Sequence, residues 1–126
     1  MSENKRTVET YLEGFRNHDH AMVLSCLTDD VEWEMAGCFH LYGKEQFDGE
    51  IEDQDCFTGK PEINCRRLVE ENDVVVAEGT VCQQMKDGTP FDAVFCDVFE
   101  MRGGKIKKLT TYLMSINSSE KTGEPI

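Results

Sequence analysis

The 126-residue sequence has few basic side chains: 13 Lys and Arg face 25 Asp and Glu, which gives a net charge of −12 at pH 7. A chain this acidic repels phosphate backbones, so we expect no nucleic-acid partner. The sequence has no basic amphipathic helix of the kind that binds membrane surfaces, and no apolar run of transmembrane length. Its first residues, MSENKRTVETYL, lack the apolar stretch of a signal peptide, so we expect none.

The sequence also lacks a CxxC pair, because its six cysteines are scattered at positions 26, 38, 56, 65, 82 and 96. In the absence of a secretory signal, we expect reduced thiols in a cytoplasmic protein. Most should behave as small apolar groups. Cys82 and Cys96 fall on neighbouring predicted strands, and the sequence leaves open whether they pair.

Motifs that bind cofactors or metals are missing as well. We find no phosphate-binding loop, dinucleotide fingerprint or nucleophile elbow, and no spacing that would bring three or four zinc ligands together. His18-Asp19-His20 resembles a chelating cluster, but Asp19 is better explained as a helix N-cap. Cys38 and His40 could form a nucleophile pair, although no third group is in evidence to orient them. We therefore expect neither cofactor nor metal.

The first half of the chain shows a helical pattern. Val8, Tyr11, Leu12 and Phe15 have the i, i+3, i+4, i+7 spacing of an amphipathic helix. Three further elements are predicted in this half: a helix from Ala21 to about Leu27, a strand over VEWEM (31–35), and a helix from about Lys44. The segment between the 31–35 strand and the helix from about Lys44 is predicted to be a loop, as is the segment 52–61.

From Glu62 onward the pattern becomes β. Four strands are predicted at 62–70, 74–85, 91–101 and 105–116, separated by the turn signals EEND, KDGT and RGGK. Sequential strands with short turns form an antiparallel meander. We therefore predict a single α+β domain over residues 1–126, with its core at about 6–116 and a frayed tail at 117–126. A curved sheet around the first helix would form a cone with an apolar pocket.

Asp97, within VFCDVFEM (94–101), is the most informative residue. Strand alternation places it on the same face as Phe95, Phe99 and Met101. Burial among apolar groups would raise its pKa and leave it as a hydrogen-bond donor aimed into the pocket. The alternative is a carboxylate held by a salt bridge or a backbone amide.

Two stretches resemble the nuclear-transport-factor-2-like superfamily, which includes ketosteroid isomerase, SnoaL-like polyketide cyclases and limonene epoxide hydrolase. They are VETYLEGFRNHDHAMVLSCLTDDVEWEMAG…YGKEQF and CDVFEMRGGKIKKLTTYLMS. The resemblance covers roughly residues 6–116. It implies the cone-shaped fold and a homodimer through the outer face of the sheet, where Cys96, Val98 and Tyr112 would lie.

Ketosteroid isomerase offers the sharpest comparison, because its tyrosine and protonated aspartate form an oxyanion hole beside a second, basic aspartate. Tyr11 and Asp97 match the first two residues, whereas Met35 takes the place of the base. Tyr11 could equally be a packed core residue. His40, in the predicted loop at the mouth, or Glu34, if a bulge turns it inward, could move the proton. His40 could instead be an ordinary surface residue.

These observations predict a pocket for a small apolar molecule. Its expected lining is Phe15, Trp33, Met35, Phe95, Phe99, Leu109 and Leu113. Trp33 is expected to form wall or core rather than to take part in chemistry. Two functions fit this pocket: a cofactor-independent isomerase or cyclase, or a non-catalytic ligand-binding or protein-association module. The Met35 substitution favours the second.

Overall fold

Two helices open the chain: α1 (Glu3–Arg16) and α2 (His20–Ser25). The computed structural model describes residues 1–116 and 122–125. One face of α1 is buried, as its spacing predicts, and the Ser2 hydroxyl caps its first turn by accepting a hydrogen bond from the Lys5 amide. The Asp19 carboxylate accepts from the Met22 amide at 3.1 Å, so the predicted cap of α2 is confirmed.

The rest of the chain is one six-stranded sheet interrupted by α3 (Gly43–Glu50). Its strands are β1 (Leu27–Met35), β2 (Phe39–Tyr42), β3 (Phe57–Glu71), β4 (Val74–Met85), β5 (Pro90–Arg102) and β6 (Lys105–Ser115). The spatial order is β2-β1-β6-β5-β4-β3, and only the β1–β6 pair is parallel. The predicted meander of the last four strands is confirmed, with β4 matching its predicted limits.

Some predicted element boundaries before residue 62 were wrong. Helix α2 ends two residues early, because the Cys26 carbonyl already accepts a hydrogen bond from the Ile106 amide of β6 at 2.8 Å. The segment predicted as a loop after β1 contains β2, which forms a hairpin with β1. Strand β3 begins at Phe57, five residues before its predicted start. Residues 122–125 have no regular structure, and the rest of the predicted tail lies outside the described residues.

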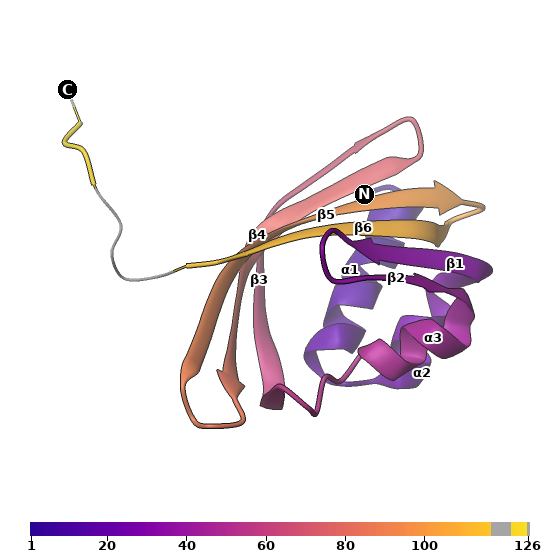
Figure 1. The fold of residues 1–126 in the computed structure, drawn as a ribbon. Coiled ribbons are helices and arrows are strands. Elements are labelled where there is room, and N and C mark those ends of the chain that lie inside the picture. The colour runs from indigo at the N-terminus through magenta and orange to yellow at the C-terminus, as the bar shows by residue number, and fades with distance from the viewer. Residues whose placement is uncertain (117–121, 126) are drawn as a thin grey trace.

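The sheet is strongly curved and does not close on itself, and the helices lie on its concave side (Figure 1). The core fills the space between them. Its largest fully buried side chains are Phe47, Phe99, Leu27, Ile106, Leu109, Val8, Val23, Val31 and Val75. Each stabilises the fold by about 1.5–3 kcal/mol relative to an exposed position. The predicted α+β class is confirmed. Within the described residues, no helix has the length and apolar character needed to span a bilayer.

Candidate functional site

A cavity of about 460 Å³ opens between α1, the end of α3 and the concave face of the sheet. This volume is in the range of small-molecule sites. Seven aromatic side chains line it: Tyr11, Phe15, Trp33, Phe39, Phe57, Phe91 and Phe95. The remaining wall combines aliphatic side chains with polar ones, and the polar groups determine what chemistry the cavity can support.

Asp97 is a buried member of these polar groups. It lies on β5 between Ala77 of β4 and Thr111 of β6, and its side chain is only 8% exposed. Its Oδ1 atom has no hydrogen-bond partner within the part of the chain that the structure describes. Burial raises the pKa of Asp97 to about 7, against the opposing effect of a hydrogen bond from Thr111. A large fraction of the carboxyl groups therefore hold a proton at neutral pH.

Thr111 links Asp97 to Trp33, the single tryptophan of the chain. The indole Nε1–H of Trp33 donates to the Thr111 hydroxyl oxygen at 3.0 Å. Because that oxygen accepts from the indole, its own proton is free to point toward Asp97. The three side chains form a polar strip in an apolar wall, and such connected hydrogen bonds reinforce one another in a buried setting.

Tyr11 enters the same cavity from α1. Its ring packs against Phe15, Phe47 and Phe99, with centroid distances of 5.7, 6.1 and 5.4 Å. Burial raises the pKa of Tyr11 well above its ordinary value, and Asp97 and Cys26 add to the effect. The phenol therefore stays protonated and can donate a hydrogen bond. The structure brings together the tyrosine and the aspartate that the sequence singled out.

A second polar group lies at the mouth, where His18, Glu50 and Asp53 line the cavity. Burial raises the pKa of Glu50, and the nearby Asp53 carboxylate raises it further. Within residues 1–116 and 122–125, no Lys or Arg lines this cavity. None of these three residues was predicted from the sequence to line the cavity. The NHDH segment was their only signal, because it breaks the helical pattern beside the pocket.

His40 and Glu34 lie outside the cavity. His40 is on β2 rather than in a loop; its Nε2 is 3.0 Å from Glu32 Oε2 and its ring stacks on Tyr42. Glu34 alternates with the inward-facing Trp33 and Met35, and its carboxylate is 3.9 Å from Lys108 Nζ. The β1–β2 hairpin explains both placements, because strand alternation turns these side chains to the outer face.

Five of the seven expected lining residues line the cavity: Phe15, Trp33, Met35, Phe95 and Leu113. The prediction was wrong for Phe99 and Leu109, which are fully buried in the core and do not reach the cavity surface. All six cysteines are free, and Cys82 and Cys96 pair across strands with other residues, so they do not face each other. The described residues contain no group of three or more side chains suited to hold a metal ion.

Comparison with known proteins adds the family. The model of the SnoaL-like domain matches residues 8–109. The chain belongs to the SnoaL-like domain family. The predicted resemblance to nuclear-transport-factor-2-like proteins is thereby confirmed. A separate comparison with curated proteins finds no match.

Solved structures support the fold of this SnoaL-like chain. It is similar to an NTF2-like protein of unknown function from Burkholderia pseudomallei K96243, at 19% identity and a TM-score of 0.81, covering 88% of this chain and 90% of that one. An LEH-like epoxide hydrolase from M. tuberculosis is 24% identical, with a TM-score of 0.77 and coverage of 89% and 83%. TerC, co-crystallised with polyporic acid, is 24% identical, with a TM-score of 0.79 and coverage of 87% and 90%.

Proposed function

We propose that the cavity binds a small, largely apolar carbonyl compound and catalyses proton transfer on it without a cofactor. The observation that carries this proposal is the Asp97 carboxyl group, buried beside Tyr11 with one oxygen unpaired. A buried polar atom without a partner is unusual in a folded protein and calls for an explanation. A ligand oxygen held by the protonated carboxyl and the phenol supplies one.

In this proposal Tyr11 and Asp97 stabilise the charge that develops during the reaction. When a base removes a proton from the carbon next to the carbonyl, the electron pair of that bond moves toward the carbonyl oxygen. The oxygen then becomes an enolate, and the two donors hydrogen-bond to it in a site with little water. Return of the proton to a different carbon completes an isomerisation, whereas attack of the enolate carbon on a second carbonyl gives a cyclisation.

The relatives support a small-molecule function. One structural neighbour is an epoxide hydrolase and another was crystallised with polyporic acid. This fold carries many unrelated activities, so the proposal for this chain depends on its own side chains. The aromatic wall suits an apolar ring system. The absence of Lys and Arg from the lining favours a neutral ligand over an anion.

A second candidate is a non-catalytic ligand-binding or protein-association module. Met35 favours it, because this residue lines the cavity where ketosteroid isomerase has its base. The fluorescence of Trp33 can report binding independently of catalysis. Trp33 is the only tryptophan and lies in the cavity wall, so its fluorescence should respond to any ligand.

We also propose that residues 1–126 form one domain with its core at about 6–116, that the protein is cytoplasmic, and that two copies associate through the outer face of the sheet. Six free thiols fit a reducing compartment. Tyr112 is 55% exposed on that outer face, beside the half-buried Cys96 and Val98. Such an exposed apolar surface is commonly covered by a partner.

The proposal is tested with 2-tetralone, an apolar ketone whose α-protons exchange in D₂O and can be followed by NMR. Two variants remove the proposed donors: Tyr11→Phe and Asp97→Leu. Each should lower the exchange rate by roughly 100-fold or more, the usual effect of removing one oxyanion-hole donor. Affinity measured by Trp33 fluorescence should change by less than about threefold, because little charge sits on the ketone before reaction.

Tyr112→Phe, which alters a tyrosine on the outer face, is the matched control and should leave exchange unchanged. Binding of 2-tetralone without exchange by the wild-type protein would favour the non-catalytic module. Full exchange activity in both cavity variants would exclude the oxyanion hole.

A further inference from the structure

We infer that His18, at the mouth of the cavity, is the group that moves the substrate proton, and that Glu52 positions it. This inference rests on the proposed function. It supplies the general base that this function needs and that Met35, at the position of the basic aspartate in ketosteroid isomerase, cannot provide. Of the three histidines in the chain, only His18 lines the cavity. Imidazole is the side chain best suited to exchanging protons near neutral pH.

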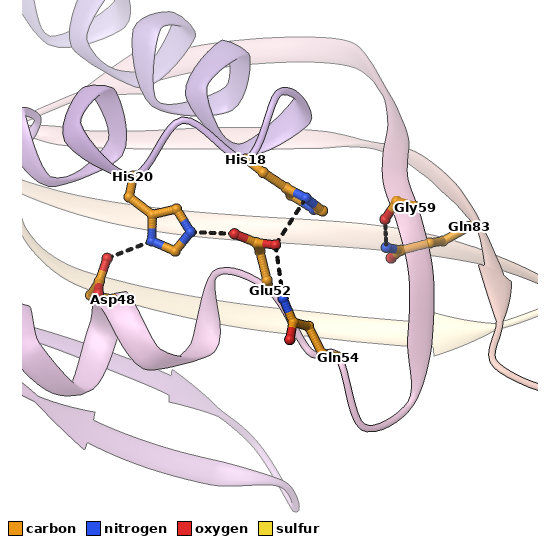
Figure 2. A network of polar contacts seen from close by, with 7 residues as sticks. All are labelled: His18, His20, Asp48, Glu52, Gln54, Gly59 and Gln83. Atoms are coloured by element: carbon orange, nitrogen blue, oxygen red, sulfur yellow. Dashed lines mark hydrogen bonds and ion pairs between the residues drawn. The ribbon is translucent and has the colours of Figure 1, made fainter.

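The contacts of His18 leave one ring nitrogen, Nε2, available to accept a proton. Its Nδ1 lies 3.4 Å from Glu52 Oε1 (Figure 2). A carboxylate beside Nδ1 stabilises the form of the ring that carries its proton there. The other nitrogen, Nε2, then has a free electron pair, and it belongs to a side chain that lines the cavity. This is the arrangement that a general base requires, with the base oriented by a third group.

Glu52 is in turn held by its own partners. His20 Nε2 contacts its second carboxylate oxygen, and Gln54 Nε2 donates to Oε1 at 3.3 Å. On its far side, His20 Nδ1 lies 2.6 Å from Asp48 Oδ1. The hydrogen bond with His20 is the main cause that lowers the pKa of Glu52, so this carboxylate remains charged. Figure 2 shows this chain of contacts linking the start of α2 to the end of α3.

The backbone at His18 provides an independent argument. Its φ angle is 53°, in the left-handed region that Gly adopts most readily and that Asn, Asp and His enter more often than other residues. The position is fixed from both sides, because the Asp19 amide bonds to the Gly14 carbonyl at 2.8 Å while the Asp19 carboxylate caps α2. This turn places the His18 side chain in the lining of the cavity.

The proton transfer balances without an added reactant. His18 Nε2 takes a proton from the carbon next to the substrate carbonyl, and the electrons of the broken C–H bond move to the carbonyl oxygen. Tyr11 and Asp97 hydrogen-bond to that oxygen, and the imidazolium then returns the proton to the same or a conjugated carbon. The charged groups around the mouth are Glu50, Glu52 and Asp53, which favour the imidazolium that forms during the step.

The test uses His18→Asn, because Asn accepts the left-handed backbone and cannot act as a base at neutral pH. Exchange of 2-tetralone in D₂O should fall by about 100-fold or more, the usual contribution of a general base. Binding reported by Trp33 should stay within about threefold. His40→Asn is the matched control, since His40 also pairs with a glutamate but lies on the outer face. It should retain the wild-type rate.

Glu52→Gln tests the positioning role. Removing the carboxylate beside Nδ1 should lower the exchange rate while binding reported by Trp33 stays within about threefold, a split that purely structural damage would not produce. Wild-type exchange in His18→Asn, combined with loss of exchange in Tyr11→Phe, would overturn the assignment of His18 while leaving the proposed function intact.

A measurement without turnover separates the two proposals further. Binding of 2-naphthol, a stable mimic of the enol, should shift the ¹⁵N resonance of His18 Nε2, and the free protein should carry its ring proton on Nδ1. If 2-naphthol changes Trp33 fluorescence but leaves the ¹⁵N chemical shifts of His18 unchanged, the inference is contradicted. This outcome can be read even if no carbonyl compound is turned over.

Discussion

At the scale of single residues, Asp97 occupies an energetically unfavourable position, because one oxygen of its buried carboxyl group has no hydrogen-bond partner among the described residues. Its cross-strand neighbours are Ala77, which offers no hydrogen bond, and Thr111, which offers one. Burying a carboxylate with so few donors is costly, and holding a proton reduces that cost. The stability of the protein should therefore depend on the protonation state of this one group.

Replacement of Asp97 by Asn should make stability less dependent on pH. The pKa of Asp97 is raised to about 7 in the folded state, against an ordinary value of about 4 in the unfolded chain. The folded state thus binds more protons between these values, so its stability falls as pH rises from about 4 to about 7. Asp97→Asn removes this loss and should be more stable than wild type at pH 8, by up to roughly 4 kcal/mol.

Urea unfolding of both proteins from pH 4 to 8 measures the difference. The gap between the two free energies of unfolding should widen with pH and level off above pH 7. A gap that is constant across this range would mean that Asp97 titrates normally.

The inward orientation of Asp97 and Tyr11 could be predicted because each depends only on a local period. Strand alternation fixes the face of Asp97, and helical spacing fixes the face of Tyr11. His18 and Glu50 could not be found this way. His18 lies in a left-handed turn between two helices, and Glu50 reaches the cavity only because α3 ends there. Such positions depend on how elements pack together.

At the scale of elements, the curvature of the sheet depends on close approach between β3 and β4. A Cβ atom on Gly79 would lie 1.9 Å from the Asn64 carbonyl oxygen. Beside it the β3–β4 register shifts between Cys65 and Arg67. Bulges of this kind bend a strand and increase its twist. Glycine at position 79 therefore allows β3 to curl toward α1, and this curl closes one side of the cavity.

Gly79→Ala should lower the free energy of unfolding by about 3 kcal/mol, since the added methyl group must displace backbone. Gly49→Ala is the matched control. That position is within α3 and a Cβ there meets nothing within 4 Å, so the variant should gain up to about 1 kcal/mol from helix propensity. Urea unfolding of both variants gives the comparison, and equal stability of the two would show that the close contact does not constrain the sheet.

The strands from 74 onward could be predicted because clear turn signals separate alternating runs. Those at β2 and the start of β3 could not. Strand β2 has only four residues, too few for a convincing period. The start of β3 contains Gly59 and Pro61, which argue against a strand. They are tolerated because β3 is an edge strand with a register shift between Thr58 and Glu62.

At the scale of the whole molecule, the net charge of −12 opposes the association that we propose. Two copies repel each other, and dissolved salt weakens this repulsion. A dimer formed through the apolar outer face should therefore become tighter as salt concentration rises. Tyr112→Lys should dissociate it, because Tyr112 is 55% exposed on that face and lysine there is costly to bury.

Sedimentation velocity at low and high salt measures this directly. The wild-type protein should sediment at twice the chain mass of 14.4 kDa and the variant at the chain mass. A wild-type monomer at both salt concentrations would rule out the dimer.

The central claim is that burial in the cavity raises the pKa of Asp97 to about 7, so that much of it still holds a proton near neutral pH. Carbon-detected NMR of its side-chain carboxyl, titrated from pH 3 to 9 and assigned with Asp97→Asn, tests it most directly. We predict a midpoint near pH 7 for Asp97. A midpoint close to 4, the ordinary value for aspartate, would contradict the account.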